Sequence, residues 1–319
     1  MRFAAAWFLV LMVACAPTPE LVANAGHTQH PVPSTSGTAP RALPSTLERN
    51  DAKSDDPGAA PHRQAKVEEP VPSPFKSAVV HREHSVARVL LYHSIGSSKL
   101  RPSVKTRVFE QQLDWLSAHG IEVIRLSQLL DFLDGELLLP RHAVVITIDD
   151  GEANGYSEAY PLLKERGLPF SLGIATRTIQ EHRRRGALSW EQLREMVDSG
   201  LCEIASHSVT HRAMTLLPDE VATHELARSR EILLEQLNLT PEAFFYPLGD
   251  HDRRIRRLTK QSGYRAAFVA HGGPVVLNTP RFWIPRYDVK PDLPMRTFRS
   301  YFNHGIRMLD DGPGAVARQ

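Results

Sequence analysis

Three short segments carry most of the side chains in this sequence that could do chemistry. Residues 147–151 read TIDDG, residues 207–211 read HSVTH and residues 245–249 read FYPLG. They supply two adjacent carboxylates, two imidazoles four residues apart, and a Pro/Gly turn with backbone N–H groups. These components can bind a divalent metal ion, activate a water molecule and stabilise an oxyanion. Together, the three segments indicate a metal-dependent hydrolase.

The histidine pair and the acidic pair are each weak evidence when taken alone. The i, i+4 spacing of His207 and His211 would place both imidazoles on one face of a helical turn, within reach of one ion. Asp149, Asp150 and Gly151 would also suit an ordinary turn. Combined, they describe two histidines and one carboxylate with open coordination positions, which is typical of a catalytic metal. Successive side chains leaving a strand diverge, so one carboxylate can face the ion and the other the water beside it.

Further residues complete this hypothesis. His93 is the best candidate for protonating a leaving amine, the alternative being a hydrogen-bonded structural histidine. Pro247 and Gly249 shape a turn that could aim the Leu248 N–H at a developing oxyanion. Arg286 could pair with a carboxylate and fix its orientation, or it could form an ordinary surface salt bridge.

The pattern along the chain predicts the elements that must position these residues. From about residue 85, short apolar runs alternate with amphipathic helices, notably at 189–199 and 218–237. Strands are predicted at 86–92, 121–124, 143–148, 170–175, 201–205, 243–246, 264–270 and 282–287. Repeated βα units predict an α/β fold, a distorted (β/α) barrel of seven or eight parallel strands. The candidate residues follow strand ends, and in such barrels that rim carries the active site.

The first residues resemble an export signal. The apolar run at 3–13 is shorter than the roughly 20 residues that a membrane-spanning helix needs. It ends in LMVAC, which resembles a bacterial lipoprotein box with Cys15 as the lipidated residue. The alternative is a plain secretory signal with an incidental cysteine. By its resemblance to Gram-negative lipoproteins, the protein is expected to be exported and lipid-anchored in the cell envelope, at the outer membrane facing the periplasm.

The remaining composition predicts the domain organisation. After the signal peptide at 1–15, residues 16–84 form a Pro/Ser/Ala-rich stretch that is predicted to be a disordered linker. The barrel is predicted at 85–305 and a flexible tail at 306–319. A formal net charge of +2 and the lack of a polybasic block argue against a nucleic-acid partner. Cys202 is expected to be a small buried core residue.

Over roughly residues 88–289, the sequence resembles the polysaccharide deacetylase family, also called the NodB-homology domain or carbohydrate esterase family four. Its motifs are Thr-Phe-Asp-Asp-Gly-like, His-Ser/Thr-x-x-His and Tyr-Pro-x-Gly segments. The resemblance implies hydrolysis of N-acetyl groups on an amino-sugar polymer, with release of acetate. It implies Asp149 as the general base and a metal, usually zinc, on Asp150, His207 and His211. Tyr246, Pro247 and Gly249 of the third motif are expected to bind substrate.

The sequence also departs from the common family pattern. Phe245 stands where the third motif often has arginine, so Arg286 is predicted to orient Asp149 instead. A late Leu-x-His motif has no clear match, and the early segment around His93 resembles a rearranged version of it. That version occurs in the branch acting on poly-β-1,6-N-acetylglucosamine, which makes this polymer, or peptidoglycan, the expected substrate.

Two alternatives stay open. The first is an O-deacetylase, or a hydrolase of another acyl or amide bond, on the same scaffold. The second is a non-catalytic glycan-binding lipoprotein. The complete metal set together with Asp149 favours an enzyme.

Overall fold

The computed structural model describes residues 73–98, 101–181 and 186–303. The predicted signal peptide with Cys15, the predicted linker as far as residue 72 and the predicted tail lie outside these ranges. Within them, no helix combines the length and the apolar character that crossing a membrane requires.

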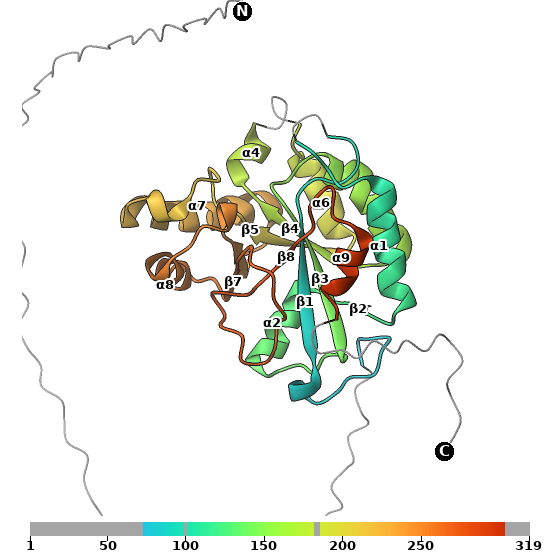
Figure 1. Cartoon of the computed structure of the whole chain (residues 1–319). Coiled ribbons are helices and arrows are strands. Elements are labelled where there is room, and N and C mark those ends of the chain that lie inside the picture. The colour runs from blue at the N-terminus through green and yellow to red at the C-terminus, as the bar shows by residue number, and fades with distance from the viewer. Residues whose placement is uncertain (1–72, 99–100, 182–185, 304–319) are drawn as a thin grey trace, which may run out of the picture. The chain divides into compact units, whose positions relative to one another are not determined.

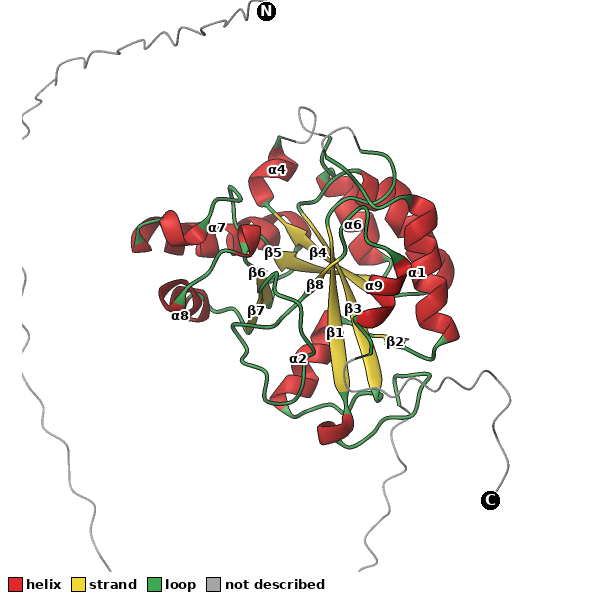
Figure 2. Ribbon diagram, in the orientation of Figure 1, coloured by secondary structure: helices red, strands yellow, loops and turns green. Residues whose placement is uncertain are grey.

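In the described part of the chain, eight strands form one sheet, and every pairing between them is parallel. Seven follow the order β7-β6-β5-β4-β3-β1-β8, and β2 pairs with β3 beside this path. The strands are β1 (Val86–Tyr92), β2 (Glu122–Val123), β3 (His142–Asp149), β4 (Phe170–Ile174), β5 (Cys202–Ser206), β6 (Ala243–Phe245), β7 (Ala266–Phe268) and β8 (Tyr287–Asp288). With the helices arranged around the central strands, this is a distorted (β/α) barrel, as predicted (Figures 1 and 2).

The segment before β8 bridges the two ends of the sheet. The Ile284 N–H donates to the Ala267 carbonyl over 3.0 Å, and the Val269 N–H donates to the Ile284 carbonyl over 2.9 Å. A few residues later, Tyr287 in β8 pairs with Leu90 in β1. The predicted strand at 282–287 is therefore mostly a connecting segment, and it carries Arg286 between the β7 side and the β1 side of the barrel.

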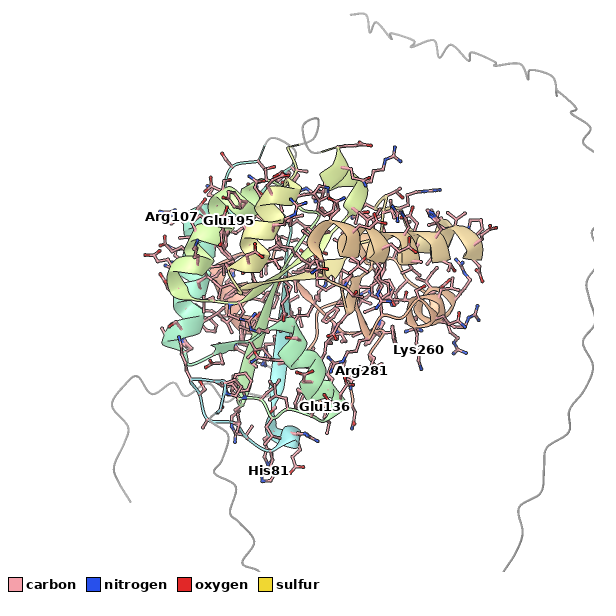
Figure 3. All side chains as sticks on the ribbon, turned by 180° about the vertical axis from the view of Figure 1, so that it is seen from behind. His81, Arg107, Glu136, Glu195, Lys260 and Arg281 are labelled. Atoms are coloured by element: carbon pink, nitrogen blue, oxygen red, sulfur yellow. The ribbon has the colours of Figure 1, made fainter. Side chains whose placement is uncertain are left out.

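The helices follow the patterns that predict them. The helix predicted at 189–199 is α6, and Ser189 caps its start, since the Ser189 side chain accepts from the Gln192 N–H. Gly135 ends α2 in the left-handed conformation, with φ at 86°. Seen from behind, labelled charged residues such as Arg107, Glu195 and Lys260 lie at the periphery of the molecule (Figure 3). The α-helices are α1 (Thr106–Ala118), α2 (Leu126–Asp134), α3 (Tyr160–Arg166), α4 (Thr176–Gln180), α6 (Trp190–Asp198), α7 (Asp219–Leu237), α8 (Arg253–Gln261) and α9 (Met295–Ser300). Shorter turns are η1 (Arg82–His84), η2 (Gly155–Ala159), η3 (Met214–Leu216) and η4 (Pro247–Gly249).

Alternation along β3 sets which side chains face the interior. Ala143 and Val145 belong to a buried cluster that also contains Phe245 of β6 and Phe268 of β7. Because side chains alternate along a strand, Asp149 shares a face with these residues. The last residue of β3 is therefore a carboxylate that points into the barrel at its carboxyl end. Cys202 is buried, as expected from the sequence.

The described chain starts before the predicted domain boundary at residue 85. The N–H groups of Lys76 and Ser77 donate to the Glu122 carboxylate over 3.1 and 3.2 Å, and the Val80 N–H donates to the Leu139 carbonyl over 3.1 Å. Residues 76–80, which were assigned to the linker, thus contact the barrel.

Candidate active site

The two adjacent carboxylates at the end of β3 both lie close to His207. Asp149 is 1% exposed, and Asp150, the first residue after the strand, has φ at 74°. This left-handed conformation is uncommon for a residue other than glycine and costs of order 1–3 kcal/mol unless its surroundings hold it. In this conformation the Asp150 side chain is directed at His207 and His211. Asp150 lines a cavity of about 310 Å³ that is also lined by His211.

Asp150, His207 and His211 converge on one point. The two histidine Nε2 atoms lie 3.1 Å apart, and Asp150 Oδ1 lies 3.3 Å from the His207 Nε2 and 3.1 Å from the His211 Nε2. Ligands of a tetrahedral ion bonded at about 2.0 Å lie about 3.3 Å from one another, so these spacings fit zinc. The three residues form a candidate metal site, since their ligand atoms all lie within 4.8 Å of one another.

Hydrogen bonding prepares His207 to be a ligand. Its Nδ1 lies 2.7 Å from the Phe245 carbonyl, so in the neutral ring the proton sits on Nδ1 and the lone pair of Nε2 faces the other two ligands. Burial alone would lower the pKa of this imidazole, but the charge of Asp149 and the contact with Asp150 outweigh burial and raise it. The pKa of Asp150 shifts in the opposite direction. Burial would raise it, but the contacts with His207 and His211 lower it well below the usual range.

The histidine segment is a loop, and the predicted helical turn is wrong. Ser208 and His211 have φ at 68° and 57°, which a right-handed helix does not allow. The Glu225 carboxylate of α7 holds the loop by accepting from the N–H groups of Val209 and Thr210, both over 2.9 Å. The imidazoles converge because of this tertiary contact, although the sequence spacing alone suggested a helix.

Asp149 is paired with Arg286, as predicted. The guanidinium donates from both terminal nitrogens to the two carboxylate oxygens, each over 2.8 Å. Arg286 is 1% exposed, and its guanidinium carbon lies 4.3 Å from the centre of the Phe245 ring. Phe245, which stands in place of the third-motif arginine, therefore packs against Arg286, an arginine from another segment. One of these two oxygens also lies close to the candidate metal ligands, since Asp149 Oδ2 is 3.8 Å from the His207 Nε2.

His93 lies directly after β1 and lines a separate, smaller cavity of about 160 Å³. Arg101 lines both this cavity and the one beside Asp150. The structure thus places the predicted acid on the same rim, with Arg101 between the two cavities. The role of His93 as an acid stays a prediction.

The third segment forms a tight turn at the end of β6. Leu248 has φ at 58° and is 70% exposed, so its side chain faces away from the core. Tyr246 and Pro247 are buried, and the Tyr246 hydroxyl donates to the Phe282 carbonyl over 3.2 Å. These two side chains support the turn from within, which is not the substrate contact that was expected of Tyr246. At Gly249, with φ at 67°, a β-carbon would lie 2.9 Å from that of Ala270.

Sequence reasoning missed several residues at this site. Glu225 lies within a helical pattern, and Arg101 lies in a loop without a recognisable motif. Thr147 precedes the acidic pair and lies 3.3 Å from the Arg286 guanidinium, but threonine is common in strands. Their contacts cross 15 or more positions of the sequence, so local spacing carries no signal for them.

Comparison with known proteins agrees with this geometry. Residues 139–267 match the polysaccharide deacetylase family. The chain belongs to this family. The matched range contains both aspartates, both histidines and the turn around Leu248, whereas His93 and Arg286 lie outside it. Members of a deacetylase family are hydrolases, which places this chain among enzymes of that class.

Named relatives of this polysaccharide deacetylase cover most of the barrel. It is 24% identical over 269 residues to the poly-β-1,6-N-acetyl-D-glucosamine N-deacetylase of Staphylococcus aureus, covering 78% of this chain and 90% of the relative. The structure of IcaB from Ammonifex degensii is 28% identical with a TM-score of 0.60, covering 70% of this chain and 99% of that one. The Streptococcus pyogenes deacetylase PplD, solved with acetate, shares the fold at 21% identity with a TM-score of 0.63, covering 68% of this chain and 97% of that one.

Proposed function

We propose that this protein is a zinc-dependent N-deacetylase of an amino-sugar polysaccharide, and that poly-β-1,6-N-acetylglucosamine is its substrate. The observation that carries the proposal is that the candidate metal ligands lie next to the Asp149–Arg286 pair. The Asp150, His207 and His211 triangle lies beside a buried, arginine-held carboxylate, with 3.8 Å between Asp149 Oδ2 and the His207 Nε2. Relatives that bear the name of this polymer and the early position of His93 support the choice of substrate.

The chain's own residues divide the reaction among them. Asp149, held by Arg286 on both oxygens, takes the proton from the attacking water, whose oxygen forms the new bond to the acetyl carbon. The Leu248 N–H is assigned to the developing oxyanion. As the C–N bond breaks, His93 donates a proton to the departing nitrogen, giving a free amine and acetate. A zinc ion held by Asp150, His207 and His211 would polarise the carbonyl and lower the pKa of the water.

The N-terminal features extend the proposal to location. Lipidation of Cys15 would anchor the chain in the cell envelope at the outer membrane, with the barrel facing the periplasm. The composition of residues 16–72 supports a tether between anchor and barrel. Mass spectrometry of the N-terminal peptide from the producing cell would detect the diacylglyceryl modification. An unmodified cysteine, or cleavage elsewhere, would contradict this assignment.

The function is tested by acetate release from β-1,6-linked N-acetylglucosamine oligomers. The full-length protein would be assayed after chelation, and again after zinc is restored. Release that stops with chelator and returns with zinc supports the proposal. Zinc binding without release from this substrate, while peptidoglycan or an O-acetylated glycan is deacetylated, would reassign the substrate. Zinc binding without any turnover would favour a glycan-binding role.

The Asp149→Asn variant tests the general base. Asparagine keeps the shape of the side chain but cannot take a proton, so acetate release should fall by a factor of about 10²–10⁴. Zinc stoichiometry should stay at the wild-type value because Asp149 is not among the three ligands. Activity close to that of the wild type would remove Asp149 from this role.

A further inference from the structure

Arg101 connects the loop after β1 to the candidate metal site. Its Nη2 atom lies 2.7 Å from Asp150 Oδ2, and its Nε atom lies 2.6 Å from Glu152 Oε1. Asp150 therefore uses one oxygen toward the histidines and the other toward Arg101. Asp150 and Glu152 are buried, whereas the Arg101 side chain is 41% exposed, so the guanidinium closes over two carboxylates from the solvent side.

The base of this loop is fastened to the chain that follows β3. The Asn154 side-chain amide donates to the Ser94 hydroxyl over 2.6 Å, and the Ser98 hydroxyl donates to Glu152 over 3.1 Å. Arg101 thus reaches Asp150 from a loop that is itself bonded to the acidic segment. One guanidinium group therefore pairs with two buried carboxylates at once, from a loop whose base is hydrogen-bonded to the acidic segment.

The charges around the candidate metal site sum to a net negative charge, which favours binding of a cation. An arginine beside a divalent ion would repel it, but Glu152 offsets the charge of Arg101. Asp149 and Arg286 form a second neutral pair. Among these five groups, three carboxylates face two guanidinium groups, which leaves one negative charge, on Asp150, for the incoming ion.

We propose that Arg101 is a positioning residue for Asp150, and that Glu152 holds Arg101 in place and cancels its charge. By binding Oδ2, Arg101 directs Oδ1 alone at His207 and His211, and it fixes the side chain before the metal arrives. This inference deepens the proposed function and rests on it. Arg101 also lines the cavity of His93, so a substrate reaching from that cavity to the metal site passes this residue.

The test measures zinc affinity of the metal-free full-length protein by competition with a chromophoric chelator. The Arg101→Gln variant should bind zinc about 10–100-fold more weakly, the usual effect of losing a residue that orients a metal ligand. Arg101→Lys keeps the charge without the fork and should recover part of that loss. Glu152→Gln should also weaken binding, because Arg101 then faces the ion with its charge uncancelled.

Arg177→Gln is the matched control. Arg177 forms an exposed ion pair with Glu181 on α4, over 3.0 Å, and its loss should leave zinc affinity unchanged. The visible spectrum of the Co²⁺-loaded protein supplies a second readout, because freeing Asp150 Oδ2 should alter it in Arg101→Gln and not in the control. Circular dichroism of the metal-free variants would confirm that each is folded.

Unchanged or tighter zinc binding by a folded Arg101→Gln variant would overturn the proposal. Tighter binding would mean that repulsion between the guanidinium and the ion exceeds any gain from orientation. A different result would contradict the proposed function: a wild-type protein that binds zinc but deacetylates no glycan. In that case, the effect of Arg101 on zinc affinity would still stand.

Discussion

At the scale of single residues, the buried pair of Asp149 and Arg286 carries the largest electrostatic consequence. Both side chains are 1–2% exposed, and two hydrogen bonds of 2.8 Å join them. Burying a charge is costly unless it is paired, so each residue makes the other tolerable in the interior. The same pairing restricts rotation of Asp149, the proposed general base. One contact thus serves both stability and orientation.

Removing Arg286 should therefore destabilise the fold as well as the reaction. Arg286→Ala leaves an unpaired carboxylate inside the barrel, and we expect the free energy of unfolding to drop by about 3–5 kcal/mol. Urea denaturation of the metal-free protein would measure this. The double variant Asp149→Asn/Arg286→Ala no longer buries a charge, so it should be more stable than Arg286→Ala. Strictly additive losses would show that the pair is not coupled.

The residues themselves explain how much of the site was predictable. The ligand set was identifiable because two histidines and an aspartate that follow strand ends must share the rim of a parallel sheet. Arg286 was predicted because Phe245 replaces the third-motif arginine, although the structure places it just before β8 and not after a strand end. Arg101 and Glu225 were not, since each acts through one contact with a residue far away in the sequence. The conformation of the histidine loop was also missed, because the contact with Glu225 overrides the local spacing.

At the scale of secondary-structure elements, Gly173 of β4 leaves room for the Asp149 carboxylate and the Phe245 ring. Gly173 pairs with Asp149 across the two strands. A β-carbon there would lie 2.7 Å from Asp149 Oδ1 and 2.6 Å from the Phe245 ring, both under any ordinary contact. Asp149, the proposed base, can lie beside the candidate metal site only because position 173 has no side chain.

Gly173→Ala should accordingly impair catalysis more than metal binding. Overpacking of a tight interior costs about 1–3 kcal/mol, and here the displaced atoms include the Asp149 carboxylate. We expect a lower kcat with zinc affinity close to that of the wild type. Gly155→Ala is the control, since a β-carbon at Gly155 meets no atom within 4 Å. Equal activity of both variants would rule out the steric account.

Helix α7 should contribute to the proposed metal binding through Glu225. Glu225→Ala leaves the N–H groups of Val209 and Thr210 without their acceptor, and the loop that carries His211 loses its anchor. Zinc affinity should fall, by a factor within the range of about 10–100 seen for residues that orient ligands. Glu231→Ala on the same helix removes an exposed pair with Arg228 and should have no effect. A folded Glu225→Ala variant with normal zinc affinity would show that the loop holds its shape unaided.

The strands of the barrel were easier to predict than the loop that carries His211. Alternating βα units predicted the strands because buried parallel strands have continuous apolar runs, and β3 is buried along nearly all of its length. The segment before β8 was only partly predictable. Ile284 hydrogen-bonds to residues in and beside β7, whereas Tyr287 pairs with β1, and these two strands lie toward opposite ends of the sheet. Its path depends on both ends of the sheet, which no local pattern encodes.

At the scale of the whole molecule, metal binding should stabilise the fold. An ion that binds only the native state adds about 2.7 kcal/mol at a concentration 100 times its Kd. For a barrel of this size, each kcal/mol shifts Tm by about 2–4 °C, so a rise of about 5–10 °C is expected. Differential scanning fluorimetry with and without zinc measures it. Asp150→Asn, which lacks the charged ligand, should show a much smaller rise.

This stabilisation should depend on pH in a defined direction. The fold raises the pKa of His207 above its usual 6.5, so its protonated form stabilises the metal-free protein at low pH. That contribution is fully present below pH 6.5 and is lost as pH rises through the folded pKa, so the Tm of the metal-free protein should fall over this window. Zinc requires the unprotonated ring, so the gap in Tm between zinc-loaded and metal-free protein should widen from pH 6 to pH 8.5. The lowered pKa of Asp150 keeps that group ionised throughout, so it adds no slope. A gap that narrows with rising pH would show that the proton and zinc do not compete for His207.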